Sequence, residues 1–272
     1  MKKIFLLVCG GLMLTSCDTI NYFQVCEVGS NLPQSSQGKY EYKDNSCTVS
    51  YDFWCSGGNP GFEFTNNSDE IIYLDLSKSF FIKNGNAYDY FLNRTVSASA
   101  SYVESASASK SGTAYGYWNA IGGLIPGSVT ASLNVGKSAA KSSTVETEEK
   151  SIVAIPPHSS KIFTEYSIIS EYFYDCDYNI TPGKKDRPTY NFQLSNSPIR
   201  FSNFITYTIG NDPTSHSFTN DFFVNSVSYY HEKAILEKEK VGCPKEERKI
   251  EVFNCASPNR FYMKYHKLPT RE

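Results

Sequence analysis

The side chains with the widest chemical repertoire in this chain are its eight cysteines. A thiol can bind a metal, form a disulfide or accept a covalent group, and its surroundings decide which of these happens. A zinc cluster needs cysteine or histidine ligands at short spacings, such as a C-x-x-C pair. The chain has no such pair, and its four histidines lie far from the cysteines and from one another. We therefore expect no metal centre and no cofactor.

Residues 1–16 are typical of a signal peptide. Lys2 and Lys3 precede an apolar run from Ile4 to Leu14, which is shorter than the roughly 20 residues that a membrane-spanning helix needs. The four residues Leu14-Thr15-Ser16-Cys17 resemble the lipobox of bacterial lipoproteins. That resemblance implies that Cys17 receives a diacylglyceryl group and that the leader is cut just before it. The alternative is an ordinary signal peptide with a structural Cys17.

A lipid on Cys17 would tether the chain to a membrane of the bacterial cell envelope. Each buried acyl CH₂ contributes about 0.8 kcal/mol, so two or more chains anchor a protein stably. In enteric bacteria an aspartate such as Asp18 beside the lipidated cysteine favours the inner membrane, but this rule is not general, so both membranes stay open. Asp18-Thr19-Ile20 also resembles the short O-glycosylation motif of Bacteroidetes, which makes Thr19 a candidate glycosylation site.

Six cysteines remain once Cys9 leaves with the leader and Cys17 carries lipid. An even number of cysteines in an exported chain predicts up to three disulfides, whose connectivity the sequence leaves open. The disulfide candidates are Cys26, Cys47, Cys55, Cys176, Cys243 and Cys255. The last two flank a charged segment that a local disulfide could close.

One segment matches a relaxed phosphate-binding pattern. Residues 131–138, ASLNVGKS, place Lys137 and Ser138 where a nucleotide-binding loop holds phosphate and magnesium. Such a loop follows a buried parallel strand and opens a helix, and neither is predicted here. We therefore expect no nucleotide ligand.

The sequence shows no catalytic constellation. It has no G-x-S-x-G motif, and His158 precedes two serines without an evident acid partner. Asp175 and Asp177 are too few oxygen ligands for a calcium loop. These observations predict that the chain is not an enzyme. An envelope hydrolase acting on glycans or peptides is the alternative, because scattered carboxylates neither nominate nor exclude a catalytic pair.

The residues above must be positioned mainly by strands, since 20 Tyr and 18 Phe favour half-buried pleated strands. Apolar residues alternate from Cys47 to Cys55, and Ile72, Leu74 and Leu76 fall on one face of another strand. Asn84-Gly85 supplies the positive φ angles of a tight hairpin turn. This meander predicts an antiparallel β-sandwich of immunoglobulin-like type.

The second half of the chain continues this pattern. The paired prolines at 156–157 separate two strands within residues 151–168, because proline cannot donate to a ladder. Three more strands are predicted within residues 198–210, 218–230 and 259–267. Only residues 231–241 look helical.

A Ser/Ala/Gly-rich insertion spans residues 96–150. Its composition offers little apolar area to offset the entropy of ordering, so we expect a flexible inserted loop. Alternatively, its alternating small residues form a membrane-inserting hairpin of a pore-forming protein. Against this, Glu104 and Lys110 would each be costly at bilayer depth.

Residues 50–91, 154–168 and 197–210, with the Ser-rich insertion before the Ile-Pro-Pro strand, resemble a group of Bacteroidetes lipoproteins to which no activity is assigned. The resemblance implies envelope location and β-architecture. We thus expect residues 1–16 to be the leader, 17–38 the lipidated tether and first strand, and 39–272 the sandwich. With 26 basic against 28 acidic side chains, nucleic acid is not an expected partner. A binding or scaffolding module with an envelope protein or glycan partner is the favoured function.

Overall fold

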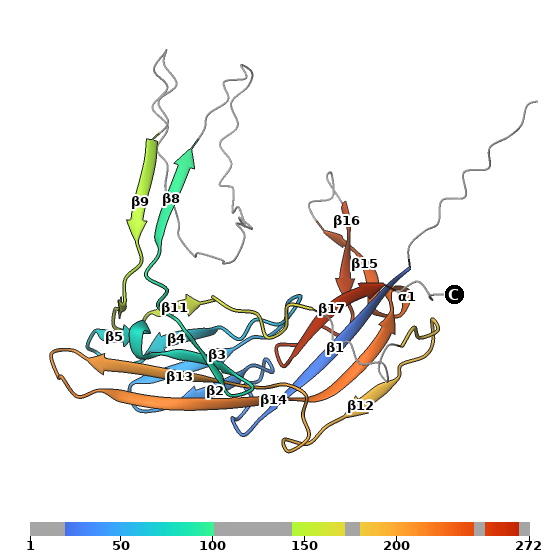
Figure 1. Cartoon of the computed structure of the whole chain (residues 1–272), viewed down its shortest axis with the longest axis horizontal. Coiled ribbons are helices and arrows are strands. Elements are labelled where there is room, and N and C mark those ends of the chain that lie inside the picture. The colour runs from blue at the N-terminus through green and yellow to red at the C-terminus, as the bar shows by residue number, and fades with distance from the viewer. Residues whose placement is uncertain (1–19, 101–142, 172–179, 242–247, 267–272) are drawn as a thin grey trace, which may run out of the picture.

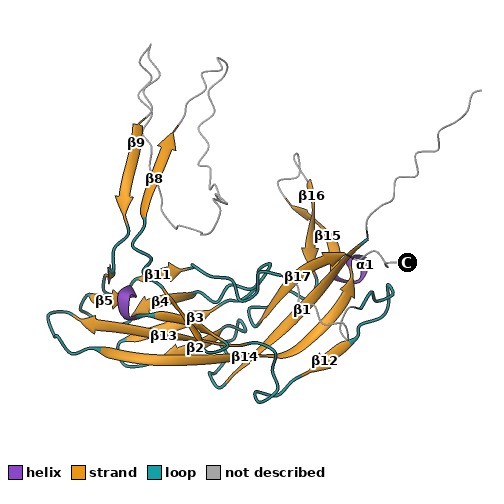
Figure 2. Ribbon diagram, in the orientation of Figure 1, coloured by secondary structure: helices purple, strands orange, loops and turns teal. Residues whose placement is uncertain are grey.

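The fold follows from short runs of alternating apolar residues. A computed structural model describes residues 20–100, 143–171, 180–241 and 248–266, and Figure 1 and Figure 2 show that strands dominate these ranges. The elements in chain order are β1 (Asn21–Ser30), β2 (Tyr40–Lys43), β3 (Cys47–Tyr51), β4 (Phe62–Asn66), β5 (Ile72–Asp75), η1 (Leu76–Lys78), β6 (Phe80–Lys83), β7 (Asn86–Asp89), β8 (Thr95–Ala100), β9 (Ser143–Glu148), β10 (Ile152–Ile155), β11 (Ser160–Phe163), β12 (Thr189–Asn191), β13 (Arg200–Ile209), β14 (His216–His231), α1 (Glu232–Ile235), β15 (Leu236–Val241), β16 (Arg248–Phe253) and β17 (Arg260–His266).

The larger sheet has the order β10-β5-β13-β14-β1-β17, with β12 beside β14 and the β6–β7 hairpin beside β13. The long strand β14 joins its two halves, because its first part pairs with β13 and its later part with β1. A register shift in β1 between Glu27 and Val28 interrupts the ladder with β14. β1 pairs with β17 on its other side, so the two ends of the described chain lie side by side.

The smaller sheet, β11-β4-β3-β2, shares one hydrophobic core with the larger sheet. Tyr51 of β3 lies 4.8 Å from Phe222 of β14, and Phe64 of β4 lies 5.6 Å from Tyr207 of β13, between ring centroids. The strands pair antiparallel throughout the described ladders. The prediction of a mostly β, antiparallel fold is therefore confirmed, while the immunoglobulin-like type stays a prediction.

Several local predictions are confirmed by the strands. Alternation in β3 buries Cys47, Val49 and Tyr51. The β6–β7 hairpin turns at Asn84 and Gly85, whose φ angles are 48° and 86°. The prolines at 156–157 separate β10, which pairs with β5 in the larger sheet, from β11, which pairs with β4 in the smaller one. The chain therefore crosses between sheets where it cannot donate to a ladder.

The helix predicted for residues 231–241 is wrong over most of its length. Only α1 is helical, and His231 caps it by accepting the N–H of Lys233 at its Nδ1 atom, 3.1 Å away. The chain then continues as β15, which pairs with β16. The charged sequence of β15 offers no apolar stripe to stabilise a helix, whereas β16 supplies a complete ladder for a strand.

The insertion at residues 96–150 is described only at its ends. There β8 and β9 form a separate two-stranded ladder, in which Thr95 pairs with Glu148 and Ala100 with Ser143. These ends are thus strands rather than the loop expected, and Figure 1 shows them leaving the body of the molecule together. Residues 131–138, with the phosphate-loop pattern, lie outside the described residues. No helix in the described ranges is long and apolar enough to cross a membrane.

Candidate functional site

The described disulfide candidates are free thiols. Cys26 and Cys47 are buried, and Cys55 and Cys255 are partly buried. Cys26 lies in β1 of the larger sheet and Cys47 in β3 of the smaller one, each packed into the common core, and the disulfide pairing stays a prediction. The remaining predicted positions, Cys17, Thr19, Cys176 and Cys243, lie outside the described residues.

The buried thiols are not suited to nucleophilic chemistry. Burial raises the pKa of Cys26 to about 12. Burial and the neighbouring carboxylate of Asp44 both raise the pKa of Cys47, whose Sγ donates to Asp44 Oδ2 at 3.5 Å. A reactive cysteine needs the opposite environment, one that stabilises the thiolate. Both side chains therefore act as parts of the core.

His158 has an acid partner that sequence reasoning missed. Its Nε2 lies 2.9 Å from Oδ1 of Asp69, which is 89 residues away in the chain. The side chains are 65% and 97% exposed, and Ser159 donates its hydroxyl to the Pro156 carbonyl instead. A triad needs a buried acid and a nucleophile bonded to the base. The pair is therefore a surface contact that fixes the turn before β11.

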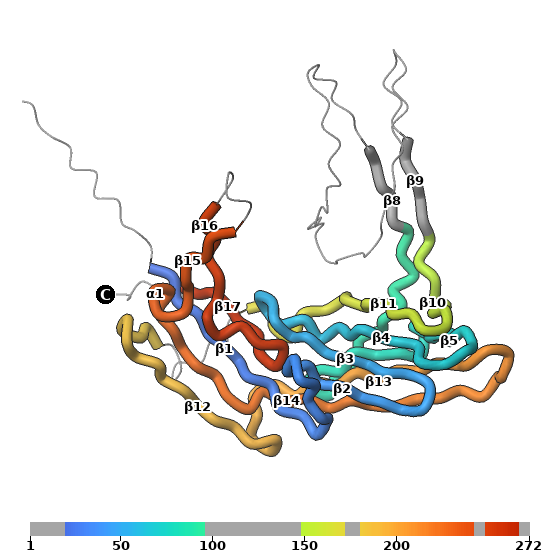
Figure 3. Tube along the Cα trace, turned by 180° about the vertical axis from the view of Figure 1, so that it is seen from behind, coloured from blue at the N-terminus to red at the C-terminus, as the bar shows by residue number. Residues whose placement is uncertain are grey.

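A pocket of about 660 Å³ lies at the start of β1 among the described residues, and we call it the β1 pocket. It is formed by Ser56 from the loop after β3 and by segments from both ends of the described chain, namely β1, α1, β15, β16 and β17. Figure 3 shows these last four elements at the opposite end of the molecule from β5 and β10. Its lining comprises Asn21, Phe23, Ser56, Glu232, Lys233, Leu236, Lys238, Glu251, Phe253, Tyr262 and Lys264.

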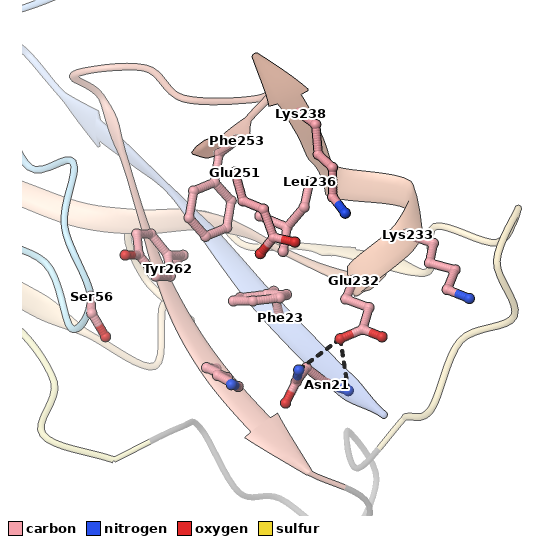
Figure 4. A pocket seen from close by; sticks show the side chains of 11 residues that line it. Asn21, Phe23, Ser56, Glu232, Lys233, Leu236, Lys238, Glu251, Phe253 and Tyr262 are labelled. Carbon is pink, nitrogen blue, oxygen red and sulfur yellow. Dashed lines mark hydrogen bonds between the residues drawn. The ribbon is translucent and has the colours of Figure 1, made fainter. Parts of the chain in front are cut away.

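Aromatic rings form the floor of the β1 pocket (Figure 4). Phe253 of β16 lies 4.3 Å from Tyr262 of β17 and 5.2 Å from Phe23 of β1, between ring centroids. Trp54 supports this floor from behind, at 5.3 Å from Phe253 and 5.2 Å from Tyr262. The rings belong to a second hydrophobic cluster around Phe23 and Ile235. The floor is therefore held in place by packing.

Charged side chains of both signs surround this floor. Lys238 of β15 and Glu251 of β16 face each other across the ladder, and Lys264 comes from β17. Glu232 is already engaged, because its Oε2 accepts the side-chain Nδ2 and the backbone N–H of Asn21 at 2.7 and 3.3 Å. Within the described ranges no ion pair is found for Lys238 or Lys264. These cations are available to an anionic group.

The arrangement has the elements of a small-ligand binding site. Pockets of this kind combine an apolar floor with a few polar groups that set orientation. Sequence reasoning missed the site because Asn21 and Glu232 are 211 residues apart, and the β1–β14 ladder, in which Tyr22 pairs with His231, brings their segments together. No group of histidine, cysteine, aspartate and glutamate side chains in the described part of the chain could hold a metal ion.

Comparison with known proteins finds no family model, no curated protein and no solved structure that matches the chain. The resemblance to the Bacteroidetes lipoproteins therefore stays a prediction. The function must be argued from the β1 pocket and the sequence that precedes it.

Proposed function

We propose that the chain is a lipid-anchored protein of the bacterial cell envelope that serves as a binding module, with the β1 pocket as its binding site. The observation that carries the proposal is the order of features at the start of the chain. A basic, apolar and then small-residue leader ends at Cys17, and the first strand begins at Asn21, which lines the pocket. The module is thus attached at the element that carries its site.

The pocket itself supports a binding role. Its packed aromatic floor offers apolar area to a ligand, and its charged rim offers the polar contacts that fix orientation. The hydrolase alternative has no specific observation in its favour among the described residues. The envelope protein or glycan partner expected from the sequence remains part of the proposal.

Metabolic labelling with a fatty-acid analogue tests the anchor. Wild-type protein should take up label, and Cys17→Ala should lose it at least tenfold, because no other residue offers the lipidated thiol. Cys9→Ala is the matched control, since this cysteine belongs to the leader and its loss should leave labelling unchanged. Equal labelling of wild type and Cys17→Ala contradicts the proposal.

A second candidate function, membrane insertion by residues 96–150, has one observation in its favour. β8 and β9 pair with each other and with no other described strand, and such a hairpin could satisfy its outer backbone groups in lipid by pairing with hairpins of further copies in a closed barrel. Release of a dye from liposomes checks this. If the hairpin inserts, the Cys17→Ala protein should release dye from the liposomes. The same protein without residues 96–150 should release none. Equal leakage from both proteins removes this candidate.

A further inference from the structure

The distance between the anchor and the β1 pocket is fixed by covalent geometry. Asn21 lies four positions after Cys17, and four residue steps span at most about 14 Å in any conformation. Since Asn21 lines the pocket, a lipidated Cys17 would hold the pocket close enough to its own leaflet to reach the headgroups. This step rests on the proposed function, because it assumes the lipid on Cys17.

The rim of the pocket has the charge pattern of a zwitterionic ligand. Lys238, Lys264 and Glu251 are exposed, and Figure 4 shows Lys238 and Glu251 directed toward the space beside the rings. An ammonium group of lysine binds phosphate, and a carboxylate binds a primary ammonium through charge-assisted hydrogen bonds. A ligand that carries a phosphate and, a few atoms away, a primary amine could bind the lysines through its phosphate and Glu251 through its ammonium group.

The aromatic floor matches the remaining part of such a ligand. The rings of Phe253 and Tyr262 pack against each other with centroids 4.3 Å apart, and tyrosine is enriched where one end of the ring is apolar and the other is wet. The glycerol and first acyl carbons of a phospholipid have this character. A free phosphate would leave the floor and Glu251 without a partner.

We propose that the β1 pocket receives the headgroup of an aminophospholipid from the leaflet that holds the Cys17 lipid. Lys238 and Lys264 bind the phosphate, Glu251 binds the primary ammonium, and Phe253 with Tyr262 packs against the glycerol region. The headgroup contact orients the tethered module, so that the end bearing β15–β17 meets the membrane and the end bearing β5 and β10 faces away (Figure 3).

Lipid-specific quenching of Trp54 tests this assignment. The chain has two tryptophans, so Trp118→Phe leaves Trp54, packed behind the pocket floor, as the only reporter. The full lipidated protein is placed in vesicles of phosphatidylethanolamine, phosphatidylcholine and phosphatidylglycerol, with bromine on the acyl chains of one lipid at a time. Brominated phosphatidylethanolamine should quench Trp54 at least twice as strongly as either other lipid at equal bromine content.

Substitutions identify the groups responsible. The Lys238→Gln/Lys264→Gln double variant should remove the preference for phosphatidylethanolamine, and Glu251→Gln should make phosphatidylethanolamine and phosphatidylcholine equal. The matched control is Lys150→Gln/Lys161→Gln, which removes two exposed lysines at β10 and β11 and should retain the preference. All of these side chains are exposed, so folding is expected to be preserved, and circular dichroism checks it.

The outcomes separate the two proposals. Equal fatty-acid labelling of wild type and Cys17→Ala would overturn the anchor, and with it the premise of this inference. Labelled wild-type protein that is quenched equally by the three brominated lipids overturns the headgroup assignment alone. A stronger response to phosphatidylglycerol, which lacks the amine, also overturns it, because the site would then be a simple anion contact.

Discussion

Asp44, in the turn between β2 and β3, holds together groups from both sheets. Its Oδ1 accepts the N–H groups of Ser46 and Cys47, each at 2.7 Å, and its Oδ2 accepts the hydroxyl of Tyr207 from β13 at 2.7 Å. Hydrogen bonds to a charged group contribute roughly 1.5–3 kcal/mol each. We expect Asp44→Ala to lower the free energy of unfolding by about 3 kcal/mol, measured by urea denaturation. Asp52→Ala is the control, because Asp52 accepts only the N–H of Trp54 in an exposed turn.

The same residue gives the stability a defined pH dependence. Burial raises the pKa of Asp44, but hydrogen bonds from Tyr207 and from the backbone of Cys47 and Ser46 outweigh this and hold the pKa below its ordinary value of 3.8. A group with a depressed folded pKa stabilises the fold above its unfolded pKa and loses this contribution as pH falls through the folded value. The difference in the free energy of unfolding between wild type and Asp44→Ala should therefore have its full value at pH 6 and become smaller below about pH 4. A difference that grows on acidification contradicts this account.

At the scale of elements, an ionic cluster closes the root of the β8–β9 ladder. Arg94 donates to both carboxylate oxygens of Glu165, at 2.6 and 2.8 Å, and to Glu149 at 3.2 Å. The other oxygen of Glu149 accepts the N–H groups of Leu92 and Arg94, each at 3.1 Å. Paired, bidentate contacts of this kind are stronger than isolated surface pairs. The cluster is thus the main polar link between this ladder and the segment after β11.

Removing the guanidinium should loosen this ladder without unfolding the body. We expect Arg94→Met to speed amide exchange in β8 and β9 about tenfold, which corresponds to about 1.4 kcal/mol, with little change in melting temperature. Lys43→Met is the control, because its pair with Glu41 is a surface contact with 63% of the lysine side chain exposed. Unchanged exchange in β8 and β9 would show that the cluster does not hold the ladder.

The elements also show what the sequence can predict. β3, β5 and the turn at Asn84 were predictable because their signals are local: alternation in the strands and positive φ at a hairpin turn. Residues 236–241 were predicted wrongly as helix. They form a strand because they pair with β16, and the propensity of a segment taken alone carries no information about its partner. The β1 pocket was not predictable at all, because it depends on long-range pairing of β1 with both β14 and β17.

At the scale of the whole molecule, the described chain has two hydrophobic clusters of unequal size. The larger lies between the two main sheets and includes Phe222, which is 2% exposed and packs against Tyr51 at 4.8 Å and Phe53 at 5.1 Å. The smaller lies under the β1 pocket and includes the partly buried Phe253. β15 and β16 pair only with each other among the described strands. We therefore expect the pocket to open locally while the sandwich-like core stays folded.

Two phenylalanine truncations distinguish the clusters. Phe222→Ala removes a fully packed ring, so it should lower the free energy of unfolding by about 3–5 kcal/mol and speed exchange throughout β13, β14 and β1. Phe253→Ala should cost about 1–2 kcal/mol, because its ring is only partly buried, and should speed exchange chiefly in β15 and β16. Urea denaturation and hydrogen exchange read by mass spectrometry measure both effects. If Phe253→Ala destabilises β13 as much as Phe222→Ala does, the two clusters unfold as one unit, and the pocket cannot respond to a ligand independently of the core.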